Sequence, residues 1–78
     1  MIDNATLTIK KQNETVTYSG VICSSIEEAS PLIHPDYWSE IPIGMMRIFN
    51  DGKKLIRYSE NTFLIRVNGS RHFVQIAN

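Results

Sequence analysis

The sequence predicts a small α+β domain that is predominantly antiparallel β-sheet, with an N-terminal hairpin, a short helical connection and a four-stranded C-terminal meander. Apolar and polar residues alternate near both ends of the chain, which is the period of half-buried strands. Turn sequences divide the last part of the chain, and a Ser-Ser-Ile-Glu-Glu sequence followed by proline marks a short helix before them. The alternative is a small SH3-like or OB-like barrel, because turn and capping signals do not determine whether a sheet closes.

The first hairpin is expected over residues 6–11 and 14–20, with its second strand continuing to about Ile22. Threonine and lysine alternate there with apolar side chains, so one face of the pair is apolar and the other is polar. A two-residue turn at Gln12-Asn13 sets the expected register. It places Lys11 opposite Glu14, Ile9 opposite Val16, and Leu7 opposite Tyr18.

The helical connection begins at Ser24 or Ser25. Either serine can form a Ser-x-x-Glu capping box with the acid three residues later, and two acids in the first turn suit the helix dipole. Pro31 disfavours helix at the preceding residue, which leaves room for about two turns with Ile26 and Ala29 facing inward. A further helical turn is expected over 34–38, with Asp36 as a capping residue, followed by an extended approach over 41–44.

The C-terminal meander is expected to comprise strands over 45–49, 54–58, 62–67 and 72–76, separated by Asn/Asp/Gly/Ser turns. A two-residue Glu60-Asn61 turn would set Tyr58 opposite Phe63 and Ile56 opposite Ile65. A two-residue Asn68-Gly69 turn would set Arg66 opposite Arg71, whereas a three-residue turn would set Arg66 against His72. Like charges placed opposite each other destabilise a sheet unless they are well solvated or an acidic group meets them.

The size of the chain indicates one domain over 1–78 with a marginal core. A core of this size is usually worth about 3–5 kcal/mol without disulfides, metal or a partner subunit, so a homodimer is one expected way to add buried area. The single cysteine rules out an internal disulfide, and no Cys/His spacing resembles a zinc site. No uncharged stretch approaches the ~20 residues of a membrane span, and no export signal is visible. We therefore expect a cytoplasmic protein without a membrane partner or cofactor.

No arrangement of residue types in the sequence favours an enzyme. Cys23 with His34 or His72 could form a nucleophile–base pair, but Cys23 ends an apolar strand and reads as a buried side chain. His34, Asp36 and Glu40 do not have the spacing of common metal ligands. Glu27 and Glu28 read as helix-start residues rather than as paired catalytic carboxylates.

Charge is strongly polarised along the chain. Residues 45–78 hold six basic and two acidic residues, a net charge of +4, and residues 1–44 hold two basic and six acidic residues, a net charge of −4. Tyr37 and Trp38 could anchor an interface or belong to the core, and Met45-Met46 reads as core at the entrance to the sheet. The protein-interface candidates are Tyr37, Trp38, Glu27, Glu28, Asp36 and Glu40. The candidates for contact with nucleic acid or an acidic partner are Lys53, Lys54, Arg57, Arg66, Arg71 and Phe73.

These patterns predict a small non-enzymatic regulator or inhibitor that binds another protein and acts by surface occlusion. Its size and type are those of proteins that phages and mobile elements encode to interfere with a host factor. The alternative is a module that binds RNA or single-stranded DNA on the basic C-terminal sheet, with Arg57, Arg66 and Arg71 beside an exposed aromatic residue. The neutral overall charge and the isoelectric point near 6.7 weigh against that alternative.

Overall fold

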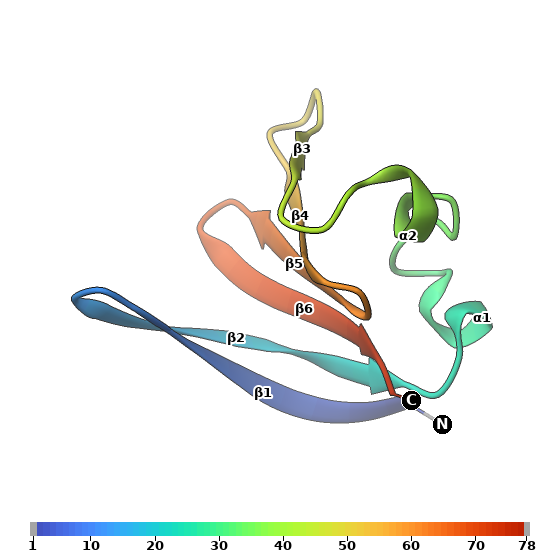
Figure 1. Cartoon of the computed structure of the whole chain (residues 1–78), viewed down its shortest axis with the longest axis horizontal. Coiled ribbons are helices and arrows are strands. Elements are labelled where there is room, and N and C mark those ends of the chain that lie inside the picture. The colour runs from blue at the N-terminus through green and yellow to red at the C-terminus, as the bar shows by residue number, and fades with distance from the viewer. Residues whose placement is uncertain (1, 78) are drawn as a thin grey trace.

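The computed structural model describes residues 2–77, which form one mixed sheet accompanied by two short helices. The strands lie in the order β1-β2-β6-β5-β4-β3 (Figure 1). The elements are β1 (Ile2–Lys11), β2 (Glu14–Cys23), α1 (Ile26–Ala29), α2 (Tyr37–Glu40), β3 (Met46–Ile48), β4 (Lys54–Ser59), β5 (Thr62–Val67) and β6 (Ser70–Ile76). The predominantly β prediction is confirmed, and the short helices are consistent with the α+β class. No pairing joins β1 to β3 within the described residues, so the strands do not close into the alternative barrel.

The parallel pairing of β2 with β6 was not predicted from the sequence. Ser19–Cys23 lie beside His72–Ile76, and this contact joins the first hairpin to the C-terminal strands. The other neighbouring strands are antiparallel. A glycine permits the close approach: a Cβ at Gly20 would overlap the carbonyl oxygen of Phe73 and lie 2.6 Å from its Cδ1.

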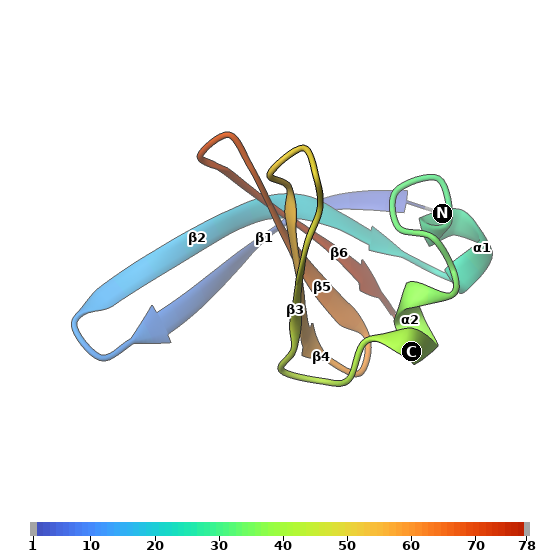
Figure 2. The same ribbon diagram turned by 90° about the horizontal axis from the view of Figure 1, so that it is seen from above.

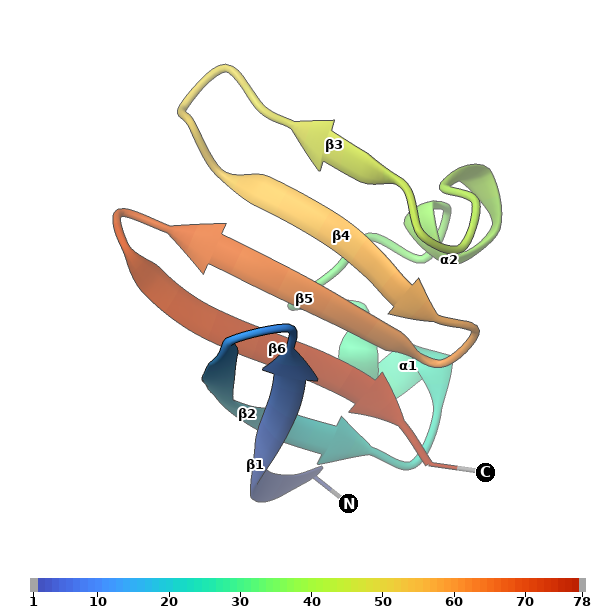
Figure 3. The same cartoon turned by 60° about the vertical axis from the view of Figure 1, so that its left-hand side comes forward.

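Buried side chains lie on both faces of the sheet. On the first, which we call the helical face, Leu55, Phe63 and Val74 pack with residues of the α1–α2 segment. On the second, the hairpin face, Leu64 and Phe73 pack with side chains of β1 and β2. Figure 2 shows both helices near the ends of β2 and β6, and Figure 3 shows the tip of the hairpin in front of β6 with α1 behind the sheet.

The register of β4 and β5 differs from the predicted one. Arg57 lies opposite Phe63, and Leu55 opposite Ile65, because the pairing shifts between Arg57 and Ser59. The extra residue in β4 is Tyr58, which forms a β-bulge. As a result Arg57 lies on the helical face with Phe63, and Arg66 lies on the opposite face.

α1 is shorter than the two turns predicted for it, and α2 is a single turn that begins later than predicted. Ser25 is the N-cap of α1 and its Oγ accepts a hydrogen bond from the Glu28 N–H at 3.3 Å, as the second capping-box alternative expects. The Glu28 carboxylate accepts from the N–H and Oγ of Ser24 rather than from the N-cap N–H. Asp36 is the N-cap residue of α2, as predicted, but its side chain makes no capping hydrogen bond. Instead, the Asp36 carboxylate lies 3.6 Å from Nδ1 of His34.

Candidate functional site

The exposed edge of the sheet at β3 is the best candidate for a functional site. Met45 accepts a hydrogen bond from the Arg57 N–H at 3.0 Å, and the Phe49 N–H donates to the Lys53 carbonyl at 2.8 Å. Main-chain groups alternate in direction along an antiparallel strand, so the groups of Met46 and Ile48 point away from β4. They are free to pair with a further strand.

Large apolar side chains are concentrated around this edge. Ile43, Met45, Met46, Ile48 and Tyr58 are between 47% and 61% exposed. We call these five residues the β3 apolar strip. Elsewhere in residues 2–77 the exposed large apolar residues are the scattered Ile2, Leu32 and Val67. Exposed apolar residues gathered in one place mark interaction sites more often than scattered ones do.

The β1 edge, at the other end of the strand order, is built differently. Its exposed positions include Thr6, Thr8, Lys10 and Lys11. Polar and charged side chains on an edge strand discourage pairing with other chains. The β3 edge carries a single charged residue, Arg47, between Met46 and Ile48. Of these two edges, β3 is therefore the one open to strand addition.

The local sequence explains why β3 is short and exposed. The Met45 N–H donates to the Pro42 carbonyl at 3.0 Å, which forms a turn, and Gly44 has φ +88°. The Gly44 N–H then donates to the Arg57 carbonyl at 2.6 Å. At the other end, the Gly52 N–H donates to the Phe49 carbonyl, which turns the chain back into β4. Two turns thus confine β3 to three residues and leave little chain to cover it.

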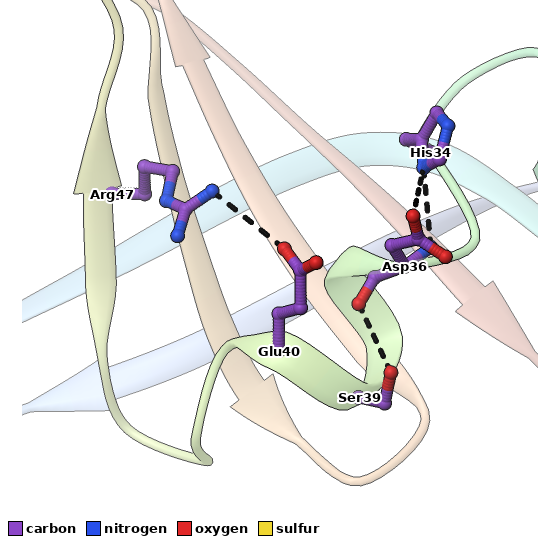
Figure 4. Close-up of polar contacts among 5 residues, drawn as sticks. All are labelled: His34, Asp36, Ser39, Glu40 and Arg47. Carbon is purple, nitrogen blue, oxygen red and sulfur yellow. Dashed lines mark hydrogen bonds and ion pairs between the residues drawn. The ribbon is translucent and has the colours of Figure 1, made fainter.

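The helical-face side of β3 is polar and aromatic. Figure 4 shows the Arg47 guanidinium and the Glu40 carboxylate pointing toward each other, with Nη1 and Oε2 4.0 Å apart. The guanidinium also lies 5.2 Å from the centre of the Tyr37 ring, and that ring lies 5.9 Å from the ring of Phe49. About half of each charged side chain is exposed, so this ion pair is weak and can exchange for another partner.

Lys53 extends the positive charge along this side. Its Nζ lies 5.7 Å from the centre of the Phe49 ring. Between the β3–β4 connection, β4, β5 and the helical segment lies a hollow of about 180 Å³, with Leu32, Tyr37, Phe49 and Lys53 in its lining. This volume is below the roughly 300–1,000 Å³ of ordinary small-molecule sites. The shape suits a side chain of a docked segment better than a complete small ligand.

Among the predicted interface residues, the structure brings Tyr37 and Glu40 to this surface. Trp38 is 7% exposed and its ring meets Phe63 edge-on, with ring centres 4.7 Å apart, so the structure places it in the core. Asp36 is exposed at the start of α2, beside His34 rather than β3. Glu27 and Glu28 belong to α1, where Glu28 is held by Ser24.

The predicted basic residues are separated by the sheet. Arg57 donates from Nη1 to the Ile41 carbonyl at 3.0 Å and from Nη2 to the Glu60 carbonyl at 2.9 Å, so it ties loops together on the helical face. Phe73 is 2% exposed and cannot stack on a base. Arg66 and Arg71 are exposed on the hairpin face, and Lys54 is half-buried beside Arg66. The expected grouping of three arginines on one face is therefore wrong, because the bulge at Tyr58 sends Arg57 to the other face.

The β3 apolar strip was missed in the sequence. Met45 and Met46 read there as core, whereas they are 55% and 50% exposed. The signal that could have found them is the brevity of the segment: apolar residues fall on both faces of a strand confined between Pro42-Ile43-Gly44 and Asn50-Asp51-Gly52. In this three-residue edge strand, Met46 and Ile48 remain exposed.

Cys23, the candidate nucleophile, is buried in the core. Burial raises the pKa of the Cys23 thiol, and the nearby Glu28 carboxylate raises it further. No group of three or more His, Cys, Asp or Glu residues is placed to hold a metal ion in the part of the chain described. None of the helices described is long and apolar enough to cross a membrane.

Comparisons with protein-family models, curated proteins and solved structures found no match.

Proposed function

We propose that this protein is a small binding module that captures an extended segment of another protein along β3. It would act as a regulator or inhibitor by covering that segment. The observation that carries the proposal is the β3 apolar strip on an edge whose outward main-chain groups are unpaired. Addition of a strand to such an edge uses main-chain hydrogen bonds for affinity and side-chain contacts for specificity.

The charges near β3 indicate the chemistry of the partner segment. Arg47 projects to the helical-face side of the edge, near Lys53, and Met46 and Ile48 project to the hairpin-face side. A strand laid beside β3 would place alternate side chains on the same two sides. An acidic residue opposite Arg47, flanked by apolar residues opposite Met46 and Ile48, complements both sides. A second copy of β3 in the central register would oppose Arg47 with Arg47, which is unfavourable.

The energy available is sufficient for a reversible complex. Fully burying an Ile or Met side chain contributes about 1.5–3 kcal/mol, so burying the exposed half contributes about 1 kcal/mol. Four such side chains in the β3 apolar strip give about 4 kcal/mol before hydrogen bonds are added and ordering costs are subtracted.

The test is selection of a library of random linear peptides on the immobilised protein, followed by amide NMR of the protein with the selected peptides. We expect apolar-acidic-apolar peptides whose binding shifts the signals of residues 44–49. The Met46 and Ile48 amide protons should become protected from hydrogen exchange, because the incoming strand accepts from them.

Variants of β3 and of β1 test which of the two sheet edges binds the peptide. Ile48→Ser removes one apolar anchor from β3, and Thr8→Ser is a conservative change at an exposed position of β1. Binding should fall with Ile48→Ser and remain with Thr8→Ser, and Arg47→Glu should shift selection from acidic to basic central residues. Peptides that perturb β1 or the helices instead of residues 44–49 would refute the proposed docking edge.

A further inference from the structure

Three cationic side chains form a line across the hairpin face, starting at Lys54, the cross-strand partner of Ile48 at the β3 edge. The pairing places Lys54 of β4 opposite Arg66 of β5, and Arg66 opposite Arg71 of β6. Residues paired across neighbouring strands share a face, and strands lie about 4.8 Å apart, so the line is about 10 Å long. We call Lys54, Arg66 and Arg71 the basic row.

The basic row is unfavourable for the free protein. It contains two successive like-charge pairs, whose members repel each other and meet no acidic partner. No carboxylate within residues 2–77 forms an ion pair with any of the three side chains; Asp36 pairs with His34, and Glu40 pairs with Arg47. The nearby Asp51 carboxylate instead accepts a hydrogen bond from the Lys53 N–H at 2.9 Å.

The fold holds this row in place and keeps much of the acidic charge away from it. Asn68 and Gly69 have φ +50° and +83°, which suits the two-residue turn that sets Arg66 opposite Arg71. Lys54, Arg66 and Asn68 line an open hollow of about 250 Å³ at this end of the sheet. The acids of the two helices belong to the segment that covers the opposite face. A chain of zero net charge thus presents a positive line on one face.

We infer that the basic row binds the phosphodiester backbone of single-stranded nucleic acid. A line of cations fits a backbone that repeats its charge, and the arginine guanidinium matches two oxygens of one phosphate. The apolar residues beside Arg66 and Arg71, which are Leu64, Phe73 and Tyr18, are buried, so an acidic peptide would gain apolar contact only at Ile48, at one end of the row. Phosphates need no such contact, because release of counterions supplies most of the affinity of non-specific binding.

The burial of the aromatic side chains near the basic row determines whether the site can distinguish one base from another. No exposed aromatic ring adjoins the row in the described structure, since Tyr58 lies at the far end of β4. Bases therefore have no stacking platform, and binding should be insensitive to base identity and sensitive to salt. For contacts to about three phosphates, the slope of log K against log salt should be about −2.

The test uses fluorescein-labelled oligodeoxythymidine and oligodeoxyadenosine, with anisotropy measured as potassium chloride is raised. We expect both oligomers to bind with dissociation constants on the order of 10⁻⁴ M at low salt, within a few-fold of each other. Arg66→Glu should weaken binding at least tenfold. The same substitution should raise the melting temperature, because it turns two repulsive pairs into attractive ones; a residue needed only for structure would lower it.

Lys10→Glu, at the hairpin tip, makes the same change in total charge away from the row and should leave binding within about twofold, since only the row contacts phosphate. Three outcomes would overturn the inference: no binding of either oligomer at low salt, equal loss with Lys10→Glu and Arg66→Glu, or preference for an oligoglutamate over both oligomers. The last would identify an acidic-peptide site.

Discussion

Replacing Gly20 with alanine should show whether the parallel contact between β2 and β6 holds this domain together. Gly20 pairs with Phe73, which is the second of the five residue pairs in that contact. An alanine Cβ would overlap the Phe73 carbonyl oxygen and lie 2.6 Å from Cδ1 and 2.7 Å from the carbonyl carbon of the same residue. The aromatic ring can rotate away, but the carbonyl group belongs to the backbone of a central strand, so the strands themselves must move apart.

The expected loss of stability follows from these contacts. In a strand without such crowding, alanine in place of glycine stabilises by about 0.4–1 kcal/mol, because the unfolded chain has less freedom to lose. Overpacking a well-filled site costs about 1–3 kcal/mol, and displacement of a backbone carbonyl lies at the upper end. We therefore expect Gly20→Ala to lower the free energy of unfolding by about 2 kcal/mol, a large part of the ~3–5 kcal/mol that a core of this size supplies.

Urea unfolding, followed by Trp38 fluorescence and by far-ultraviolet circular dichroism, measures this loss. Ser19→Ala is the matched control, because Ser19 is the exposed neighbour in the same strand, and it should change stability by less than about 0.5 kcal/mol. If Gly20→Ala unfolds within 0.5 kcal/mol of the wild type, β2 and β6 do not approach each other as closely as described, and the reasoning about this contact is wrong.

Three further predictions concern residues on either side of the sheet. Arg66→Glu should raise the free energy of unfolding by about 0.5–1 kcal/mol, seen as a melting temperature several degrees higher, since it relieves two like-charge pairs; an unchanged or lower value would contradict the pairing. Arg57→Ala should lower the free energy of unfolding in urea by about 1–3 kcal/mol because two loop carbonyls lose their donor, whereas Arg71→Ala should have a smaller effect. Cys23, which is 1% exposed and whose thiol pKa is raised by burial, should react with a disulfide reagent at pH 8 at least ~100-fold more slowly than in urea; equal rates would mean that the thiol is accessible.

Local signals in the sequence were sufficient for much of the strand pairing. The Gln12-Asn13 turn predicts Lys11 opposite Glu14 and Leu7 opposite Tyr18, and both pairs occur. The Asn68-Gly69 turn predicts Arg66 opposite Arg71, which also occurs and which supplies part of the basic row. These features are determined locally because a two-residue turn leaves one register for the strands that it joins.

The candidate binding surfaces depended on contacts that local patterns do not report. The bulge at Tyr58 moved Arg57 to the helical face, and the core closed over Trp38 and Phe73, so three predicted contact residues are not offered to a partner as expected. Met45 and Met46, by contrast, were predicted to lie in the core but are exposed at the β3 edge.

The difference between the features that local patterns predict and those that they miss has a physical origin. Alternation, capping residues and turn residues act over a few positions, so the sequence alone determined a β-rich chain, its polarised charge, the approximate strands and two of the turn registers. The choice of edge strands, the parallel pairing of residues 19–23 with 72–76 and the burial of each face involve segments about 50 residues apart. Only the tertiary structure decided these features, because burial is a property of the assembled sheet. The exposure of β3 and of the basic row was decided in the same way.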